Sequence, residues 1–160
     1  MGPTSSAAAT GPEGFPEVVL GNLEADFVRI QALGRLHVGA SDYWDGNWLI
    51  TPVRIKVDGF EGTIAPSLRA EELSAFLGAL RQVYHDLKGR AVLESMEGVL
   101  RLAVDVVSGG RLAIAGEAAN RPGGRNRLSF VIEGLDQTYL PAVIGSLEMI
   151  ERRYQTVGRP

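Results

Sequence analysis

The residue types that could carry chemistry are concentrated in one segment, DYWDGNWL, at residues 42–49. It contains both tryptophans of the chain and two aspartates. At this spacing, Asp42 and Asp45 could act as an acid–base pair or bind a hard cation. Aspartate in a turn also accepts hydrogen bonds from nearby backbone N–H groups, and the Asp45-Gly46 and Gly46-Asn47 dipeptides favour a turn. We therefore predict a tight turn that leads into a strand, with no catalytic residue and no metal ligand.

Other sources of catalytic chemistry are weak. The chain has no cysteine, which excludes a disulfide framework, a thiol nucleophile and a cysteine metal site. Its two histidines, His37 and His85, lie far apart without metal-ligand spacing around them. Neither a glycine-rich phosphate loop nor a Gly-x-Ser-x-Gly motif is present. We expect a protein that is not an enzyme and needs no cofactor.

The two tryptophans leave two alternatives open. Large aromatic side chains are mostly found in cores, and a helix could cover the sheet face that carries Trp48. On the predicted strand, however, Trp48 would share a face with Arg54 and Lys56, and an exposed aromatic ring beside charges is typical of a protein–protein interface. Trp44 could also simply cover the end of the sheet.

Length and charge restrict the class of protein. The chain has 160 residues, a net charge of −3 and a pI of about 5.4, and this length favours one domain. Without a cluster of Lys and Arg, we expect no nucleic-acid partner. No apolar run approaches the roughly 20 residues that span a bilayer, so we expect no membrane partner. Residues 1–10 lack the features of a signal peptide, which favours a cytoplasmic location.

The chain divides into three parts. Residues 1–16 are rich in Gly, Pro, Ser, Thr and Ala and are predicted to be a disordered leader. Residues 17–155 are expected to form a single α+β domain, and residues 156–160 a frayed tail. Within the domain, residues 47–57 are predicted to form one strand whose odd-numbered positions face the core. Pro52 places that strand at a sheet edge or at a bulge.

Two amphipathic helices are predicted, over residues 69–88 and 137–154, from apolar stripes at helical spacing. Ser67 and Asp136 are the expected N-caps. Short strands with short connections precede each helix, which predicts antiparallel sheets and an α+β fold.

The two helices carry a sequence echo. Residues 73–80 and 140–147 have Leu, Ala, Gly and Leu at the same four positions. A duplicated strands-then-helix unit is one explanation, and the shared period of any two amphipathic helices is the other. In either case, Gly78 and Gly145 would allow a helix to approach its neighbour closely.

The DYWDGNWL segment, which opens a predicted strand and is followed by an apolar helix, resembles the WapI-type immunity proteins. Three other segments add to this resemblance, which covers most of residues 17–155: SLRAEEL at 67–73, EGVLRL at 97–102 and LDQTYL at 135–140. Members of this family are small bacterial cytosolic proteins. They neutralise the C-terminal toxin domain of a wall-associated, contact-dependent toxin.

The resemblance implies stoichiometric binding, without catalysis, to the C-terminal domain of a wall-associated or secreted polymorphic toxin. If that toxin is a nuclease, its substrate site is basic and favours an acidic partner. The positions that match the motif are Asp42, Trp44, Asp45, Asn47 and Trp48, and we expect them to form the partner-binding patch. The motif could instead be a fold-defining turn, with the interface elsewhere.

A second class of function stays open. In this alternative the chain is a small-ligand-binding or enzymatic α+β domain, with Asp42 and Asp45 as polar anchors in a cleft. The sequence does not indicate an oligomeric state.

Overall fold

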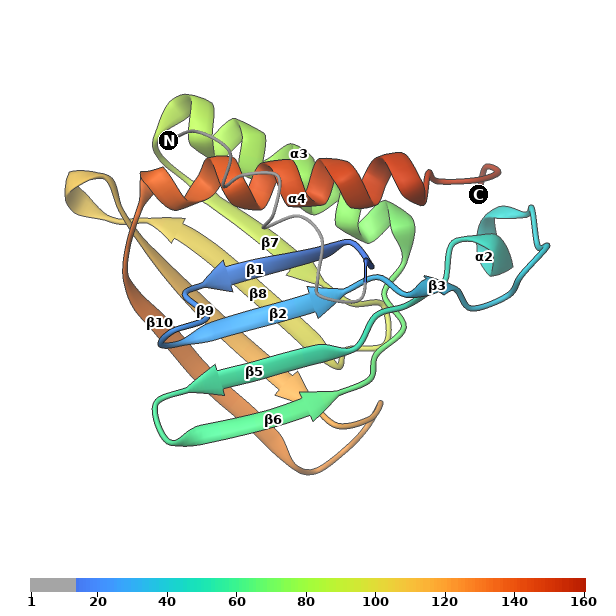
Figure 1. The fold of residues 1–160 in the computed structure, drawn as a ribbon, viewed down its shortest axis with the longest axis horizontal. Coiled ribbons are helices and arrows are strands. Elements are labelled where there is room, and N and C mark those ends of the chain that lie inside the picture. The colour runs from blue at the N-terminus through green and yellow to red at the C-terminus, as the bar shows by residue number, and fades with distance from the viewer. Residues whose placement is uncertain (1–13) are drawn as a thin grey trace.

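The computed structural model describes residues 14–160 and has an α+β architecture. Two four-stranded antiparallel sheets lie against two long helices (Figure 1). This is the fold class that the sequence predicts. Most of the predicted leader lies outside the described residues. Within them, the Pro16 carbonyl already accepts a hydrogen bond from the Ala32 N–H at 2.9 Å, so the fold includes the last leader position.

The first sheet is a meander that is followed by a helix. Its strands lie in the order β1 (Glu17–Gly21), β2 (Phe27–Gln31), β5 (Val53–Val57) and β6 (Phe60–Ile64), and α3 (Ala70–Asp86) follows them. On β5, Val53 and Ile55 are buried while Arg54 is exposed. This alternation confirms the predicted core face and is what a strand with one buried face requires.

The second sheet repeats this arrangement. Its strands, in chain order, are β7 (Arg90–Glu94), β8 (Leu100–Val106), β9 (Arg111–Ala119) and β10 (Arg127–Asp136). The 3₁₀ turn η1 (Ser108–Gly110) joins β8 to β9, and η2 (Gln137–Tyr139) leads into α4 (Leu140–Arg153). Asp136 caps this start as predicted, because its Oδ1 accepts a hydrogen bond from the Thr138 N–H at 2.8 Å.

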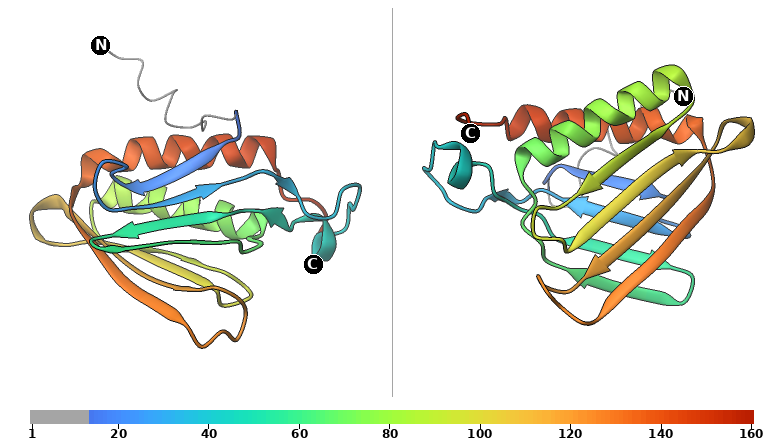
Figure 2. Two further views of the ribbon diagram at one scale, coloured as in Figure 1. Left: turned by 60° about the horizontal axis from the view of Figure 1, so that its bottom comes forward. Right: turned by 180° about the vertical axis from the view of Figure 1, so that it is seen from behind.

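The arrangement of strands followed by a helix therefore occurs twice (Figure 2). This agrees with a duplicated unit, which is one of the two explanations of the sequence echo. The two units exchange their helices: α3 packs on β7, and α4 packs on β1. The helices also pack against each other. Each helix thus lies on the first strand of the other unit, which joins the two units into one body.

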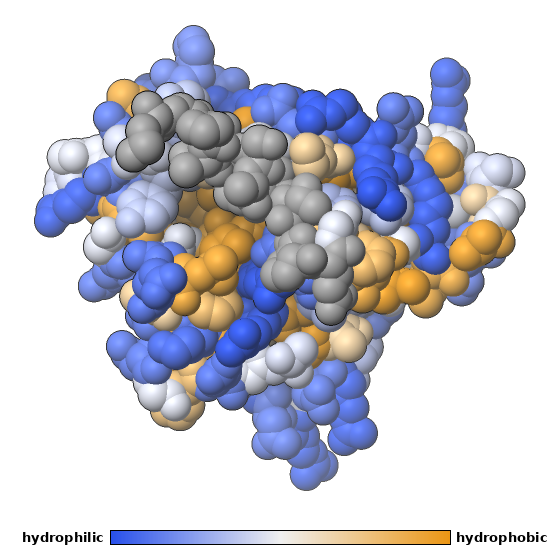
Figure 3. Space-filling view, viewed as in Figure 1, coloured by the Kyte–Doolittle hydropathy of each residue, from blue (hydrophilic) through white to orange (hydrophobic). Residues whose placement is uncertain are grey.

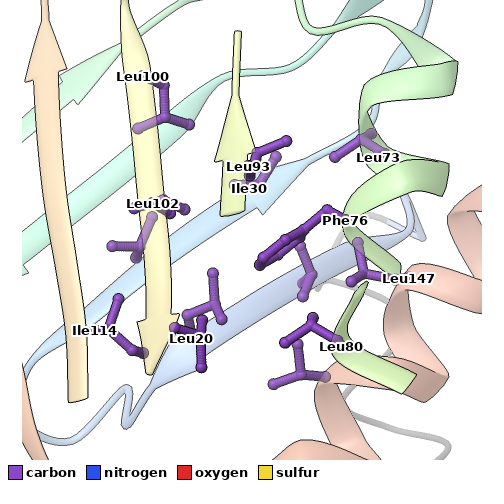
Figure 4. Packing of buried hydrophobic residues seen from close by; sticks show 14 of the residues in the cluster. Leu20, Ile30, Leu73, Phe76, Leu80, Leu93, Leu100, Leu102, Ile114 and Leu147 are labelled. Atoms are coloured by element: carbon purple, nitrogen blue, oxygen red, sulfur yellow. The ribbon is translucent and has the colours of Figure 1, made fainter. Parts of the chain in front are cut away.

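The hydrophobic core fills the space between sheets and helices (Figure 4). Phe76 of α3 and Leu147 of α4 lie there with Leu20, Ile30 and Leu93 from the strands, all essentially inaccessible to solvent. Truncating one such side chain typically costs about 2–5 kcal/mol. The body is therefore a rigid support for the segments at its surface.

Two expectations about the helices are wrong. The N-cap of α3 is Arg69 and not Ser67, and the Arg69 N–H is satisfied by Glu72 Oε1 at 2.8 Å. Nor do Gly78 and Gly145 serve close packing, since a Cβ atom added at either position would meet no heavy atom within 4 Å.

The predicted strand over residues 47–57 is interrupted at Pro52. Its first part, β4 (Leu49–Ile50), pairs with β3 (Gly34–Arg35) in a separate two-stranded sheet, and β5 begins after the proline. Between β3 and β4 lies the short helix α2 (Tyr43–Gly46). We call residues 34–50 the lobe, because they project from the sheets near the C-terminus (Figure 1).

Candidate functional site

Within the DYWDGNWL segment, Tyr43–Gly46 form one turn of helix, α2, where we predicted a tight turn. The segment leads into strand β4 at Leu49, as predicted. Asp42 is the N-cap. Its Oδ2 accepts hydrogen bonds from the backbone N–H groups of Trp44 at 3.1 Å and Asp45 at 3.0 Å. Its carbonyl accepts one from the Gly46 N–H at 2.9 Å. Asp42 therefore has the usual task of aspartate before a helix.

Asn47 holds the lobe to the C-terminal end of the chain. Its side chain is fully buried. The amide nitrogen donates to the carbonyls of Tyr43 and Val157, both at 2.9 Å, and Oδ1 accepts from the Val157 N–H at 2.9 Å. We expected the chain to fray from Thr156, and the structure shows this part bonded to the lobe instead. Asn47 has no surface left for a direct contact with a partner.

Arg35 forms a second connection to the same end. Its guanidinium donates to the carbonyls of Gly46 and Gln155, both at 2.7 Å. Gly158, at φ +67°, then passes so close that a Cβ atom there would lie 2.5 Å from the Tyr43 nitrogen. Glycine is the residue that tolerates both this backbone conformation and this approach.

A buried arginine is the centre of the lobe. Arg69 is inaccessible to solvent and donates to the carbonyls of Trp44 at 2.8 Å and Tyr43 at 2.7 Å. Its Nε pairs with the Glu71 carboxylate. The guanidinium carbon lies 4.7 Å from the ring centre of Trp48. The Tyr43 and Trp44 ring centres are at 5.2 and 5.8 Å.

This arrangement replaces water around a buried charge with carbonyls, a carboxylate and aromatic faces. A buried charge is costly unless it is paired and hydrogen-bonded, and cation–π contact adds about 0.5–2 kcal/mol per desolvated pair. Arg69 therefore fixes α2 and both tryptophans to the start of α3. No local sequence pattern distinguishes Arg69 as a site residue, because arginine is ordinarily a surface residue.

The outward side of the lobe is apolar. The exposed fractions are 92% for Val38, 57% for Trp44, 44% for Leu36 and 41% for Ile50, while Trp48 is half-buried. We call these five residues the apolar patch. In the space-filling view, apolar surface extends over the end of the molecule where the lobe lies (Figure 3).

Strand register places three of the patch residues on one face. Gly34 is paired with Ile50, and the Leu36 N–H donates to the Trp48 carbonyl at 2.8 Å, which continues the same register. Directly opposite residues and alternate residues of an antiparallel pair point to the same side. Leu36, Trp48 and Ile50 therefore lie together, while Leu49 points into the core.

The expected neighbours of Trp48 are wrong. Trp48 precedes β4, forms an isolated bridge with Arg69 and contacts its guanidinium. Arg54 is instead paired with Glu61, and Lys56 donates to the Ala25 carbonyl at 3.3 Å. The interruption at Pro52 is the physical reason, because it assigns Trp48 and the two basic residues to different sheets.

The structure brings Asp42 and Asp45 to the surface of one helical turn and not into a cleft. Two cavities, of about 690 and 360 Å³, lie elsewhere, between the β5–β6 hairpin and strands β9 and β10. Phe60 and Leu128 line both of them. Neither of these two cavities is lined by Asp42 or Asp45.

In the described part of the chain, the two histidines do not form a site with other titratable or metal-binding side chains. His37 is exposed, and the side chain of His85 is 84% exposed, with Nδ1 2.9 Å from Asp86. Within residues 14–160, no group of three or more His, Cys, Asp or Glu side chains could hold a metal ion. The exposed surface of the lobe carries aromatic, aliphatic and acidic groups together with the imidazole of His37.

The sequence matches the Immunity protein WapI-like family over residues 19–155. The chain belongs to the WapI-like immunity protein family. Membership points to neutralisation of a cognate toxin by binding and to a role that is not enzymatic. The matched range begins within β1 and includes the lobe, the remaining strands of both sheets and both long helices of this WapI-like protein.

Two other comparisons add little. No curated protein matches the sequence. A solved structure of Trypanosoma bruciei MRP1/MRP2 is similar over 94% of this chain and 90% of that chain, with 12% identity and a TM-score of 0.48. In the part of the chain that the structure describes, none of the helices has the length and apolar character needed to cross a membrane.

Proposed function

We propose that this WapI-like protein neutralises a cognate bacterial toxin by forming a stoichiometric, non-catalytic complex with the toxin domain. The partner is the C-terminal domain of a wall-associated or secreted polymorphic toxin of the kind used in contact-dependent inhibition. The acidic pI of about 5.4 suits a toxin with a basic substrate site, such as a nuclease. The two proteins would meet in the cytoplasm, where a delivered toxin domain must be blocked.

One observation carries the choice of surface: an exposed apolar patch lies on a lobe that a buried arginine fixes in place. Contiguous exposed apolar surface marks interaction sites, and tryptophan is enriched among the residues that dominate interface energetics. A surface that is already ordered also loses less conformational entropy when it binds. The lobe combines the two properties, because it carries the apolar patch and is already held in place by Arg69.

The five motif residues have different roles in this proposal. Trp44 and Asp45 are exposed and contact the toxin. Asp42 is exposed too, but one carboxylate oxygen is committed to the helix cap. Trp48 presents part of its ring to the partner and the rest to Arg69. Asn47 is buried and supports the others without contact.

Titration calorimetry with the toxin domain encoded beside the immunity gene tests the proposal, with growth rescue scored in parallel. The wild type should form a one-to-one complex and restore growth. Trp44→Ala should weaken binding by about 30-fold or more, because aromatic anchors at interfaces contribute about 2 kcal/mol or more.

Phe60→Ala is the matched control. Phe60 is another exposed aromatic residue, at 66%, and lies at the β5–β6 turn, at the opposite end of the sheets from α2 (Figure 1). It should leave the affinity unchanged. A complex that Phe60→Ala weakens and Trp44→Ala does not would place the interface at the β5–β6 hairpin. Absence of any complex and of rescue would refute the proposed function.

A further inference from the structure

The chemistry of the lobe indicates what kind of group its partner presents. The sequence has no Lys or Arg between Arg35 and Arg54, whereas Asp42 and Asp45 lie on the exposed side of α2. Arg35 is committed to two backbone carbonyls, and Arg69 is buried. The accessible charge of the lobe is therefore negative.

Acceptor capacity around Trp44 is also unused. Within residues 14–160, the Asp45 carboxylate has no hydrogen-bond partner, and Asp42 uses only Oδ2. Glu71 Oε2 is buried and likewise has no partner among these residues. Glu71 belongs to the same cluster, because its other oxygen pairs with Arg69, whose guanidinium carbon lies 5.8 Å from the Trp44 ring centre. Buried polar atoms ordinarily have partners.

We propose that the lobe receives a lysine or arginine side chain of the toxin, with the cation on the exposed face of Trp44 and against the Asp45 carboxylate. This inference rests on the proposed function and adds the chemistry of the partner: the docking surface of the toxin is basic, with an apolar region that covers the patch. The argument is charge complementarity. A cation is attracted to the face of a tryptophan ring, and opposite potentials across an interface accelerate association and exclude wrong partners.

The test is calorimetry of the complex with a catalytically inactive toxin domain, at 50, 150 and 500 mM NaCl in separate titrations. The affinity of the wild type should fall as salt rises, because the charges of the lobe are exposed. Asp45→Asn should bind about five- to tenfold more weakly at the lowest salt, and the loss should disappear at the highest. Asp42→Asn/Asp45→Asn should lose more, since asparagine keeps the N-cap and removes only the charge.

Glu24→Gln is the charge control. Glu24 is exposed in the β1–β2 turn, far from α2 in the fold (Figure 1). Its substitution removes one negative charge, as Asp45→Asn does, but outside the lobe. It should leave the affinity and its salt dependence unchanged. Trp44→Phe and Trp44→Leu distinguish the contribution of an aromatic ring from that of apolar volume. Because the cation requires a π face, the Trp44→Leu variant should bind the toxin several-fold more weakly than the Trp44→Phe variant. Unfolding midpoints of all variants check that the fold is retained.

The outcomes distinguish this inference from the function on which it rests. A tight complex that is insensitive to salt and to Asp45→Asn would overturn the basic partner and leave the proposed function standing. The same follows if Trp44→Leu binds as well as Trp44→Phe. Concentration-dependent dimerisation in light scattering that Trp44→Ala abolishes would assign the lobe to a second copy and overturn the inference. Absence of any complex would overturn both proposals.

Discussion

Replacing Arg69 with methionine should be among the most damaging single changes in the chain. Methionine has a similar length and keeps most of the packing, but it removes the guanidinium. The Trp44 carbonyl would then lose its 2.8 Å bond from Arg69, and Glu71 would lose its cation. The three aromatic rings around the guanidinium would lose a cation–π contact each.

The magnitude follows from these losses. Hydrogen bonds to charged groups contribute about 1.5–3 kcal/mol each, and removing one partner of a buried ion pair typically costs about 3–5 kcal/mol. Two features limit the total. The Tyr43 carbonyl keeps its bond from Asn47, and the Glu71 side chain, 23% exposed, can turn toward water. We therefore expect the free energy of unfolding to fall by about 3–5 kcal/mol.

Urea unfolding measures this loss by two probes. Both tryptophans contact Arg69, so fluorescence reports on the lobe, while far-UV circular dichroism reports on the whole fold. Arg69→Lys keeps the charge but not the planar fork, and should show a smaller loss in the same direction. It also provides a measurable variant if Arg69→Met does not fold.

Arg54→Met is the matched control for this experiment. Arg54 is also paired with a glutamate, Glu61, and also lies over an aromatic ring, but its side chain is 48% exposed. Exposed ion pairs contribute about 1 kcal/mol or less. If Arg69→Met lowers the free energy of unfolding no more than Arg54→Met does, the buried guanidinium does not hold the lobe in place.

Four further predictions concern positions in or near the lobe and on α3. Gly46→Ala should destabilise the fold by about 1–3 kcal/mol in urea unfolding, because the new Cβ would lie 2.6 Å from Val157 Cγ2. Gly78→Ala, with no atom within 4 Å of the new Cβ, should instead stabilise the fold by about 1 kcal/mol. Asn47→Ala should accelerate hydrogen exchange of the Val157 amide and leave the sheet amides protected; unchanged exchange at Val157 would contradict the bonds described here. Burial raises the pKa of Glu72 above its ordinary value of 4.5, so the folded state binds more protons than the unfolded state above that pH. The free energy of unfolding should therefore fall as pH rises from 4.5 through the folded-state pKa, and Glu72→Gln should flatten this part of the profile; a carboxyl NMR titration measures the pKa directly.

The parts of the fold that repeat at a regular spacing could be predicted from the sequence. The stripes of α3 and α4 and the alternation on β5 each span enough residues for a period to be visible. α2 has four residues and offers no period, so Asp42, Asp45 and Gly46 indicate a turn from sequence alone. The contact between Asn47 and Val157 joins positions 110 apart in the chain, and no local pattern indicates it.

The role of Arg69 is not visible in the sequence for a related reason. Position 69 is predicted to start a helix, where a charged residue ordinarily faces solvent. Its burial depends on carbonyls of Tyr43 and Trp44, which become available only because the α2 helix ends there. The first turn of one helix and the last turn of another thus satisfy the same guanidinium, an arrangement that exists only in the folded chain.

Helix geometry explains why some residues of the motif face the body and others face solvent. An α-helix completes a turn in 3.6 residues, so consecutive positions of a one-turn helix must face both the body and the solvent. Asn47 faces the body, and Trp44 and Asp45 face solvent. One motif can therefore serve both purposes: Asn47 supports the fold, while Trp44 and Asp45 remain available to a partner. Stability and affinity should separate accordingly. Changes at Trp44 should lower the affinity more than the stability, because the ring makes one cation–π contact with Arg69 and is mostly exposed. Changes at Asn47 should alter binding only as far as they loosen the lobe.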